Sequence, residues 1–162
     1  MHVRIGAVIF LMAVCVATAT LCRVQAAQDQ AAAGDDSEVR PAVTKTDLEI
    51  VEHARRILDT PAKWNRADNR KCPDGAKAFS LYCALEKATY EVTGSFEHRG
   101  AAMQEARFVI EEVAPDWKKY DHRLMDYNND PKTNFADVQK LFQLLHERIE
   151  RRLKEQSAAP KQ

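Results

Sequence analysis

The sequence has 162 residues, of which 45% are hydrophobic and 30% are charged, a composition that excludes an intrinsically disordered chain and suits one domain with a modest core. Lys plus Arg and Asp plus Glu both number 24, so the formal net charge is zero. A protein that binds nucleic acid needs a clustered basic surplus, and the charge balance therefore argues against DNA or RNA as a partner.

The first 26 residues have the pattern of a cleaved signal peptide. Arg4 precedes an uncharged stretch from Ile5 to Leu21, and the small residues Val24 and Ala26 follow it. These features direct export and cleavage. An uncleaved membrane anchor is the alternative, but the Ala and Thr residues of the stretch insert weakly. We therefore expect cleavage after Ala26, no stable membrane span afterwards, and a periplasmic or secreted protein.

The remaining sequence divides into a spacer, one helical domain and a tail. Residues 27–44 are rich in Ala, Gln, Asp and Ser without apolar periodicity, which is typical of a flexible spacer. Residues 45–155 contain the amphipathic segments, and residues 156–162 form a similarly polar, disordered tail. With only 5 Gly and 6 Pro, and many helix-forming residues, the composition favours an all-α fold.

Four segments of the domain show apolar residues at helical spacing. The first is expected to start at Thr46, which forms a capping-box pattern with Glu49. The second is expected to end at Gly94, a residue that suits a C-terminal cap. The expected helices span about residues 46–59, 76–93, 99–114 and 134–153.

Four amphipathic helices can bury their apolar faces only against one another, so we predict a compact all-α bundle of about four helices. About 19 residues, Pro115–Thr133, separate the third helix from the fourth, which is too long for a plain turn. This long loop contains Trp117, Tyr120 and Tyr127. We expect it to pack on the bundle, with room in it for a short helix.

Three motifs resemble a known bacterial family of small domains. They are Ala54–Trp64 (ARRILDTPAKW), Ser80–Leu85 (SLYCAL) and Tyr127–Asp130 (YNND), the last followed by an apolar helix over Phe135–Ile149. The resemblance extends over about residues 48–153. The family is domain of unknown function 6197, so the resemblance implies the helical fold and transfers no activity and no site. Most members look cytosolic, whereas this chain has an export signal.

Cys72 and Cys83 are the cysteines that remain after signal cleavage. In an oxidising compartment such a pair favours a disulfide, which would tie the loop before the second helix to that helix. Closing such a loop stabilises a fold by about 3 kcal/mol in the chain-entropy model. The alternative is a free, buried Cys83 that acts as a small apolar residue. A metal site there is disfavoured, since no second Cys pair or spaced His pair accompanies them.

Residues 126–137 have part of the spacing of a calcium-binding loop. The oxygen-bearing side chains at the ligand positions are those of Asp126, Asn128, Asp130, Asn134 and Asp137. Pro131 stands where the sharp turn needs Gly, and the last ligand is Asp where the loop normally has Glu. Asn and Asp residues before helices also cap free amides and stabilise turns, which is the interpretation that we favour.

No catalytic motif is recognisable, and we expect a non-enzymatic protein without a cofactor. The leading hypothesis is an interaction or binding module of the cell envelope with an unidentified protein partner. Its candidate binding patch is the aromatic set Trp117, Tyr120 and Tyr127. The alternatives are a calcium-binding protein that uses the Asp126–Asp137 loop and an envelope hydrolase that uses paired carboxylates. The sequence indicates no particular oligomeric state.

Overall fold

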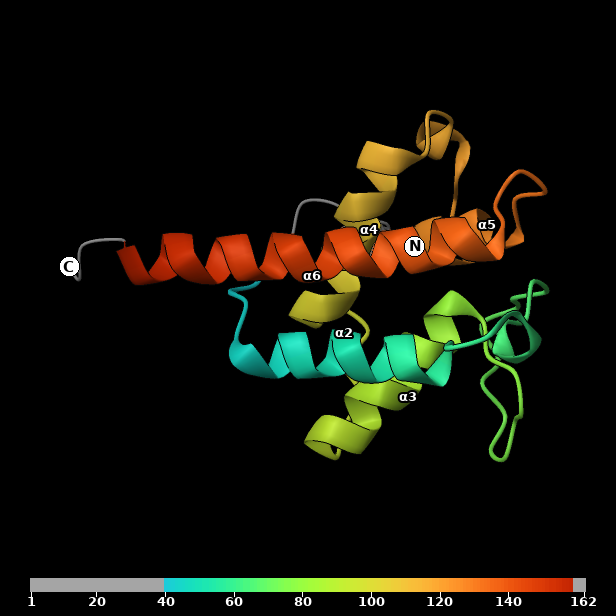
Figure 1. Ribbon diagram of the computed structural model, residues 1–162, viewed down its shortest axis with the longest axis horizontal. Helices are drawn as coiled ribbons and strands as arrows, with labels where there is room; N and C mark the ends of the chain where they lie inside the picture. The colour runs from blue at the N-terminus through green and yellow to red at the C-terminus, as the bar shows by residue number, and fades with distance from the viewer. Residues whose placement is uncertain (1–39, 159–162) are drawn as a thin grey trace, which may run out of the picture. The chain divides into compact units, whose positions relative to one another are not determined.

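The computed structural model describes residues 40–158, which form a helical bundle without strands (Figure 1). α2 and α6 lie side by side and run antiparallel, α4 crosses behind them, and α3 packs against α2. The all-α prediction is thus confirmed. The elements are α2 (Lys45–Ile57), η2 (Pro61–Lys63), α3 (Leu81–Thr93), α4 (Ala101–Val113), η3 (Trp117–Lys119), α5 (Arg123–Asn129) and α6 (Phe135–Ala158).

The predicted signal peptide at 1–26 lies outside the described residues, as do most of the predicted spacer and the last four residues. None of the helices in the described part is both long and apolar enough to cross a membrane. The folded part is longer than predicted at both ends. The Gln156 side-chain amide donates to the Val43 carbonyl and accepts from the Val43 N–H, both at 3.0 Å, so each end holds the other.

The core consists of apolar stripes that the helices turn toward one another. In α6, side chains at three- and four-residue steps have no exposed surface: Val138, Leu141, Phe142, Leu145 and Ile149. α4 is buried at every position from Ala101 to Ile110. The segment Pro115–Thr133 contains η3 and α5 and packs on the bundle, as the sequence predicts.

α2 begins earlier than predicted, and the expected capping box at Thr46 and Glu49 is wrong. The cap is Thr44, whose backbone N–H and hydroxyl both donate to Asp47 Oδ2 at 2.8 Å. Asp47 Oδ1 accepts from the backbone N–H of Ala102 at 3.0 Å, in the first turn of α4. One buried carboxylate therefore serves two helix starts, which a pattern within a single helix cannot reveal.

α3 begins at Leu81, later than the predicted 76. The helix does not reach back to residue 76, because Phe79 forms an isolated bridge with Trp64. The Phe79 N–H donates to the Lys63 carbonyl at 2.8 Å, and the Phe79 carbonyl accepts from Asn65 N at 2.9 Å. Ser80 then caps the helix by accepting from Cys83 N at 3.2 Å. The end at Gly94 is as predicted, with the left-handed φ of 76° that glycine permits.

Glu105 of α4 is a fully buried carboxylate that two arginines of α6 neutralise. Arg148 Nε donates to Glu105 Oε2 at 2.7 Å, and Arg152 donates to the other carboxylate oxygen. Arg148 also pairs with Glu112. A buried charge is costly unless it is paired, so this network favours one register of α4 against α6.

Asn128 of α5 is fully buried and holds the loop between α2 and α3. Its Oδ1 accepts from Trp64 Nε1 at 2.8 Å and from Leu81 N at 3.0 Å. Its Nδ2 donates to the Asn65 carbonyl at 3.0 Å and to Asn129 Oδ1 at 3.1 Å. All the hydrogen-bonding positions of this amide are used, and the bonds span α5, η2 and the start of α3.

Cys72 and Cys83 form the predicted disulfide, with their Cα atoms 5.3 Å apart. Cys83 lies in the first turn of α3 and is 5% exposed, whereas Cys72 lies in the loop and is partly buried. The disulfide therefore ties the middle of the loop to the start of α3, which Asn128 also holds.

Asn128→Ala is expected to lower the free energy of unfolding by about 3 kcal/mol, because it leaves the buried donors of Trp64 and Leu81 unpaired. Asn69→Ala, an exposed change in the same loop, serves as the control and should cost less than about 1 kcal/mol. Urea unfolding measures both. Equal losses in the two variants would contradict the assigned role of Asn128.

Replacing Cys72 and Cys83 together by Ala is expected to lower the free energy of unfolding by about 3 kcal/mol. The reason is that the unfolded chain without the disulfide regains the conformational entropy that closing this loop removes. The oxidised wild-type protein should also lose this stability when a reductant is added. Intact mass before and after reduction reports whether two protons are gained. An unchanged mass would show that the purified chain holds free thiols.

Candidate binding groove

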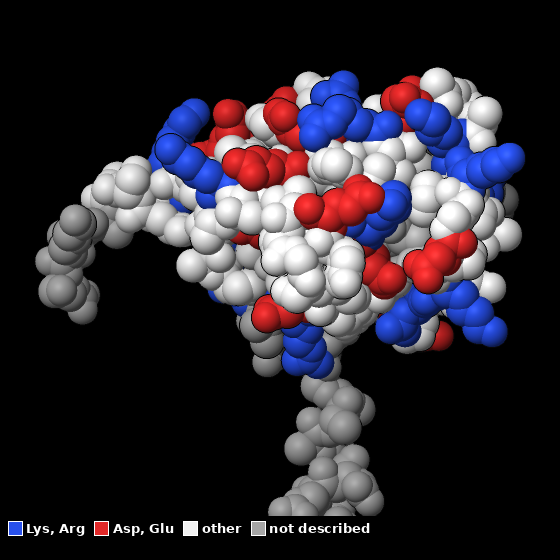
Figure 2. Space-filling model, turned by 90° about the horizontal axis from the view of Figure 1, so that it is seen from below, with Lys and Arg blue, Asp and Glu red and all other residues white. Residues whose placement is uncertain are grey.

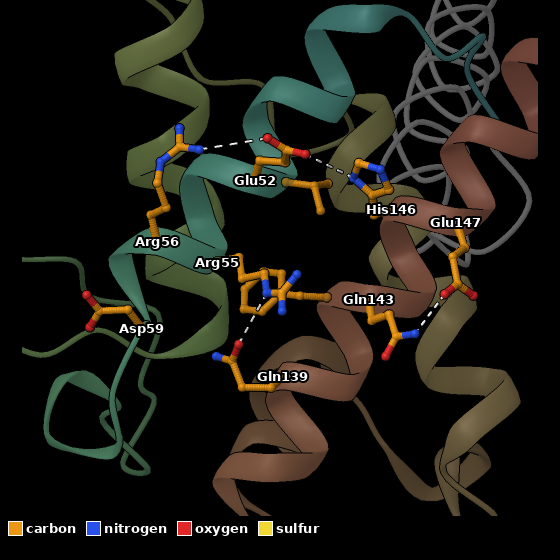
Figure 3. A pocket seen from close by; sticks show the side chains of 10 residues that line it. Glu52, Arg55, Arg56, Asp59, Gln139, Gln143, His146 and Glu147 are labelled. Carbon is orange, nitrogen blue, oxygen red and sulfur yellow. Dashed lines mark hydrogen bonds and ion pairs between the residues drawn. The ribbon is translucent and has the colours of Figure 1, made fainter.

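An open groove of about 570 Å³ lies between α2 and α6 (Figure 3). Its floor includes Val51, which is 1% exposed, and Phe142, which has no exposed surface. Polar residues form its rims: Glu52, Arg55, Arg56 and Asp59 from α2, and Gln139, Gln143, His146 and Glu147 from α6. The volume lies within the range of ligand sites, and most of the lining side chains are polar.

Helical spacing places these residues on one surface. The rim positions of each helix recur at steps of three or four residues, so they project from the same side as one another. The adjacent apolar stripe of each helix turns into the core and supplies the floor. Gln139 joins the two helices at one end of the groove, because its Nε2 donates to the Leu58 carbonyl at 2.6 Å.

Arg55 is the cation that lies most directly over the groove. Figure 3 shows its side chain extending from α2 toward α6, where its Nε donates to Gln139 Oε1 at 3.4 Å. Within residues 40–158 its two terminal nitrogens have no hydrogen-bond partner. A guanidinium with exposed terminal nitrogens can bind a carboxylate through two parallel hydrogen bonds.

The rest of the rim is a loose chain of charges. Glu52 stands between Arg56, at 3.8 Å, and His146, at 3.6 Å (Figure 3). The other ring nitrogen of His146 lies 3.6 Å from Glu150. These distances exceed those of strong hydrogen bonds, and exposed pairs of this kind contribute little to stability. The rim side chains can therefore change partners when a ligand enters.

Asp59 lies at the end of α2 and points away from the centre of the groove (Figure 3). A hydrogen bond from Lys63 Nζ, 2.9 Å from Asp59 Oδ2, lowers the pKa of this carboxyl below its usual value. The Asp59 carboxylate therefore already has a partner and does not compete with an incoming anion for the Arg55 guanidinium.

The face of the molecule in Figure 2 mixes basic and acidic side chains without a patch of one sign.

Three of the five candidate calcium ligands, Asp126, Asn128 and Asp130, have separate hydrogen-bonding roles. Asp126 caps α5 by accepting from His122 N at 2.7 Å, which agrees with the favoured capping interpretation. Asn128 is the buried residue that holds the loop. Asp130 accepts from the Tyr120 hydroxyl and from Lys132 N, both at 2.8 Å. Residues 40–158 contain no group of three or more His, Cys, Asp or Glu side chains that could hold a metal ion.

The predicted aromatic patch needs a correction. Tyr127 is 6% exposed and belongs to the core, because α5 turns it and Leu124 inward. Trp117 and Tyr120 are partly buried and pack against that core. The segment is not fully buried, but it does not present the three rings together as one exposed surface.

Tyr120, Tyr127 and Asp130 line a second hollow of about 340 Å³. Burial, followed by the negative charges of Asp137 and Asp130, raises the pKa of Tyr127 to about 12. Burial and the hydrogen bond to Asp130 also raise the pKa of Tyr120. Both phenols are therefore neutral at physiological pH, and they act as hydrogen-bond donors and packing groups.

The sequence alone does not predict the groove, because charged residues on amphipathic helices are normally solvated surface. The signal was the position of Arg55 and Arg56 beside the apolar stripe of one helix, and of His146 beside the stripe of another. These two positions can be recognised as one surface only when α2 and α6 are known to be neighbours.

The model of a family described as "Family of unknown function (DUF6197)" matches residues 42–148 of the chain. The matched range contains every residue that lines the groove. No curated protein and no solved structure matches the chain.

The raised pKa of Tyr127 predicts a loss of stability between pH 10 and about 12. The folded chain keeps this phenol protonated, whereas the unfolded chain releases the proton at about pH 10, so rising pH favours unfolding. Tyr127→Phe should reduce the loss without abolishing it, because Tyr82 and Tyr120 also have raised pKa values. Urea unfolding at pH 8 and pH 11 measures the difference, and the same pH-dependent loss in both proteins would contradict it.

Proposed function

The chain belongs to the family of unknown function DUF6197, which supplies no activity, and we propose that it is an exported, non-enzymatic binding module of the cell envelope. The observation that carries the proposal is the groove between α2 and α6, with its buried apolar floor and the unpaired terminal nitrogens of Arg55. Interfaces are enriched in such combinations of an apolar centre and an arginine.

Export is supported by two independent features. Residues 1–26 have the order of charge, apolar stretch and small residues that signal peptides share. The disulfide between Cys72 and Cys83 is of the kind that persists in oxidising compartments and is rare in the cytosol.

Binding is favoured over catalysis by the composition of the groove. Its lining contains no Ser, Thr, Cys or Tyr side chain that could act as a nucleophile, and its carboxylates at Glu52, Asp59 and Glu147 each pair with a neighbouring side chain. His146, its one imidazole, faces carboxylates at 3.6 Å and has no hydroxyl or thiol to activate. A general base must lie within hydrogen-bonding reach of the group that it deprotonates.

The partner that fits is a protein segment with an apolar side chain next to a carboxylate. The carboxylate would pair with Arg55, and the apolar side chain would lie on the aliphatic parts of the rim side chains, because Val51 and Phe142 have almost no exposed surface. The Gln139 and Gln143 amides would supply further hydrogen bonds at the rim. Such a segment would bury its hydrophobic part and keep its charge paired, which is what a stable interface needs.

A photo-crosslinking amino acid at Gln143 tests this proposal in the native host. The control places it at Lys154, an exposed position of α6 outside the groove. The full-length chain with the Gln143 substitution should yield a specific adduct in the envelope fraction, which mass spectrometry identifies, and the control should not. The same adducts from both positions would contradict the proposal.

Arg55→Ala should then weaken binding of the identified partner about 10-fold, since an interfacial charge-assisted contact contributes on the order of 1.5 kcal/mol. Arg151→Ala, which changes an exposed arginine of α6 outside the groove, should leave the affinity unchanged. Isothermal titration calorimetry compares the two variants. Equal affinities would mean that the partner binds elsewhere.

A further inference from the structure

The second hollow, of about 340 Å³, lies where the end of α4 meets α5 and the first turns of α6. All the residues that line it come from one stretch of the chain, residues 113–141. Tyr120 and Tyr127, two rings of the predicted aromatic patch, are among them. So are Asp130 and Asp137 of the predicted calcium loop. Two separate features of the sequence therefore meet at one hollow, whose volume lies within the range of small-molecule sites.

Two aspartates of this lining already have partners. Asp116 pairs with Lys119 at 2.9 Å and with Lys132 at 3.2 Å. Asp130 accepts from the Tyr120 hydroxyl and from the backbone N–H of Lys132, both at 2.8 Å. These contacts stabilise the wall of the hollow, and they leave neither Asp116 nor Asp130 as a free charge for a ligand.

One group of each sign is left without a partner on α6. Lys140 is exposed and has no ion pair or hydrogen bond with any residue from 40 to 158. Asp137 Oδ2 accepts from the Asn134 N–H at 2.9 Å, whereas Asp137 Oδ1 has no hydrogen-bond partner among the same residues. Asp137 and Lys140 are three positions apart and so project from one side of the helix, but they form no ion pair with each other. A carboxylate oxygen and an ammonium group are both available to a ligand.

Two buried hydroxyl groups of the lining also lack a good partner. Thr133 and Tyr127 are each 6% exposed. The Thr133 hydroxyl has no hydrogen bond within the described residues, and the Tyr127 hydroxyl reaches the Asp137 carbonyl only at 3.5 Å. A buried hydroxyl without a good hydrogen bond costs free energy. The lining therefore calls for an acceptor that these donors can reach.

The remaining surface of the hollow is apolar and partly open. Val113 and Tyr120 are half-buried and Pro115 is exposed, whereas Ala114 and Leu141 are buried. An apolar group in the hollow can therefore contact Val113, Pro115 and the Tyr120 ring. Apolar walls with a few polar groups that fix orientation are what small-molecule sites share.

We propose that this hollow binds a free amino acid with an apolar side chain. The ammonium group of the ligand donates to Asp137 Oδ1, and its carboxylate accepts from Lys140 and the Thr133 hydroxyl. Its side chain lies against Val113 and Pro115. An anion alone would leave the Asp137 oxygen unpaired, and a cation alone would leave Lys140 unpaired, so a zwitterion is the class of molecule that satisfies both.

The site is independent of the proposed binding function, because the hollow and the groove between α2 and α6 share no residue. Binding of an amino acid can therefore fail while the groove binds its partner, and the reverse also holds.

An NMR titration of the full mature chain with L-leucine as the probe tests the proposal. We expect saturable amide shifts with a dissociation constant of about 1 mM or lower. The analogue 4-methylpentanoate lacks the ammonium group and 3-methylbutylamine lacks the carboxylate, so each should bind about 10-fold more weakly or less. No shifts with L-leucine up to 10 mM, or equal binding of either analogue, would overturn the proposal.

Substitutions in the lining provide a second test. Lys140→Gln should weaken L-leucine binding about 10-fold. Asp137→Asn, which keeps an oxygen for the Asn134 N–H, should weaken it by a similar factor. Lys154→Gln, which changes an exposed lysine of α6 outside the hollow, should leave the affinity unchanged. Equal affinities in Lys140→Gln and Lys154→Gln would overturn the assignment.

The same spectra locate the ligand and show whether each variant is folded. The largest shifts with L-leucine should fall in residues 113–116 and 133–141. Arg55→Ala, a change in the groove, should leave the affinity for L-leucine unchanged. Loss of binding in Arg55→Ala alone would place the amino acid in the groove and would also overturn the proposal.

Discussion

The hydrogen bonds of Asn128 are the constraint on which one side of the molecule depends. A single buried amide joins α5 to the indole of Trp64, to the backbone of Asn65 and to the first residue of α3. The Leu81 N–H is buried at that position, so the cost of losing the amide includes the desolvation of this donor. The loop before α3, with its disulfide, is therefore attached to the start of α3, which Asn128 already holds in place.

The other side of the bundle is organised by charge. Buried Glu105 draws Arg148 and Arg152 of α6 against α4, and this sets which face of α6 remains for α2. The groove is the outer edge of that α2–α6 contact. Phe142, which forms part of its floor, belongs to the core, so the shape of the groove depends on the packing that stabilises the fold.

The sequence predicts the parts that depend on local pattern. The all-α class, the apolar stripe of α6 and the end of α3 at Gly94 follow from periodicity and glycine chemistry. The misses share one cause, a partner that is distant in the sequence: Asp47 caps α4 as well as α2, and Phe79 is bonded to Lys63 and Asn65. The groove was missed for the same reason, since its two rims are separated by about 80 residues.

The loop before α3 shows why export would matter to this chain. It has no helix or strand beyond one isolated bridge, and its stability comes from Asn128, Asn129 and the Cys72–Cys83 bond. A reducing cytosol would remove the bond. An oxidising compartment, to which we propose that the chain is exported, provides it. Where the bond forms, the loop and the start of α3 would be more stable than in a reducing cytosol.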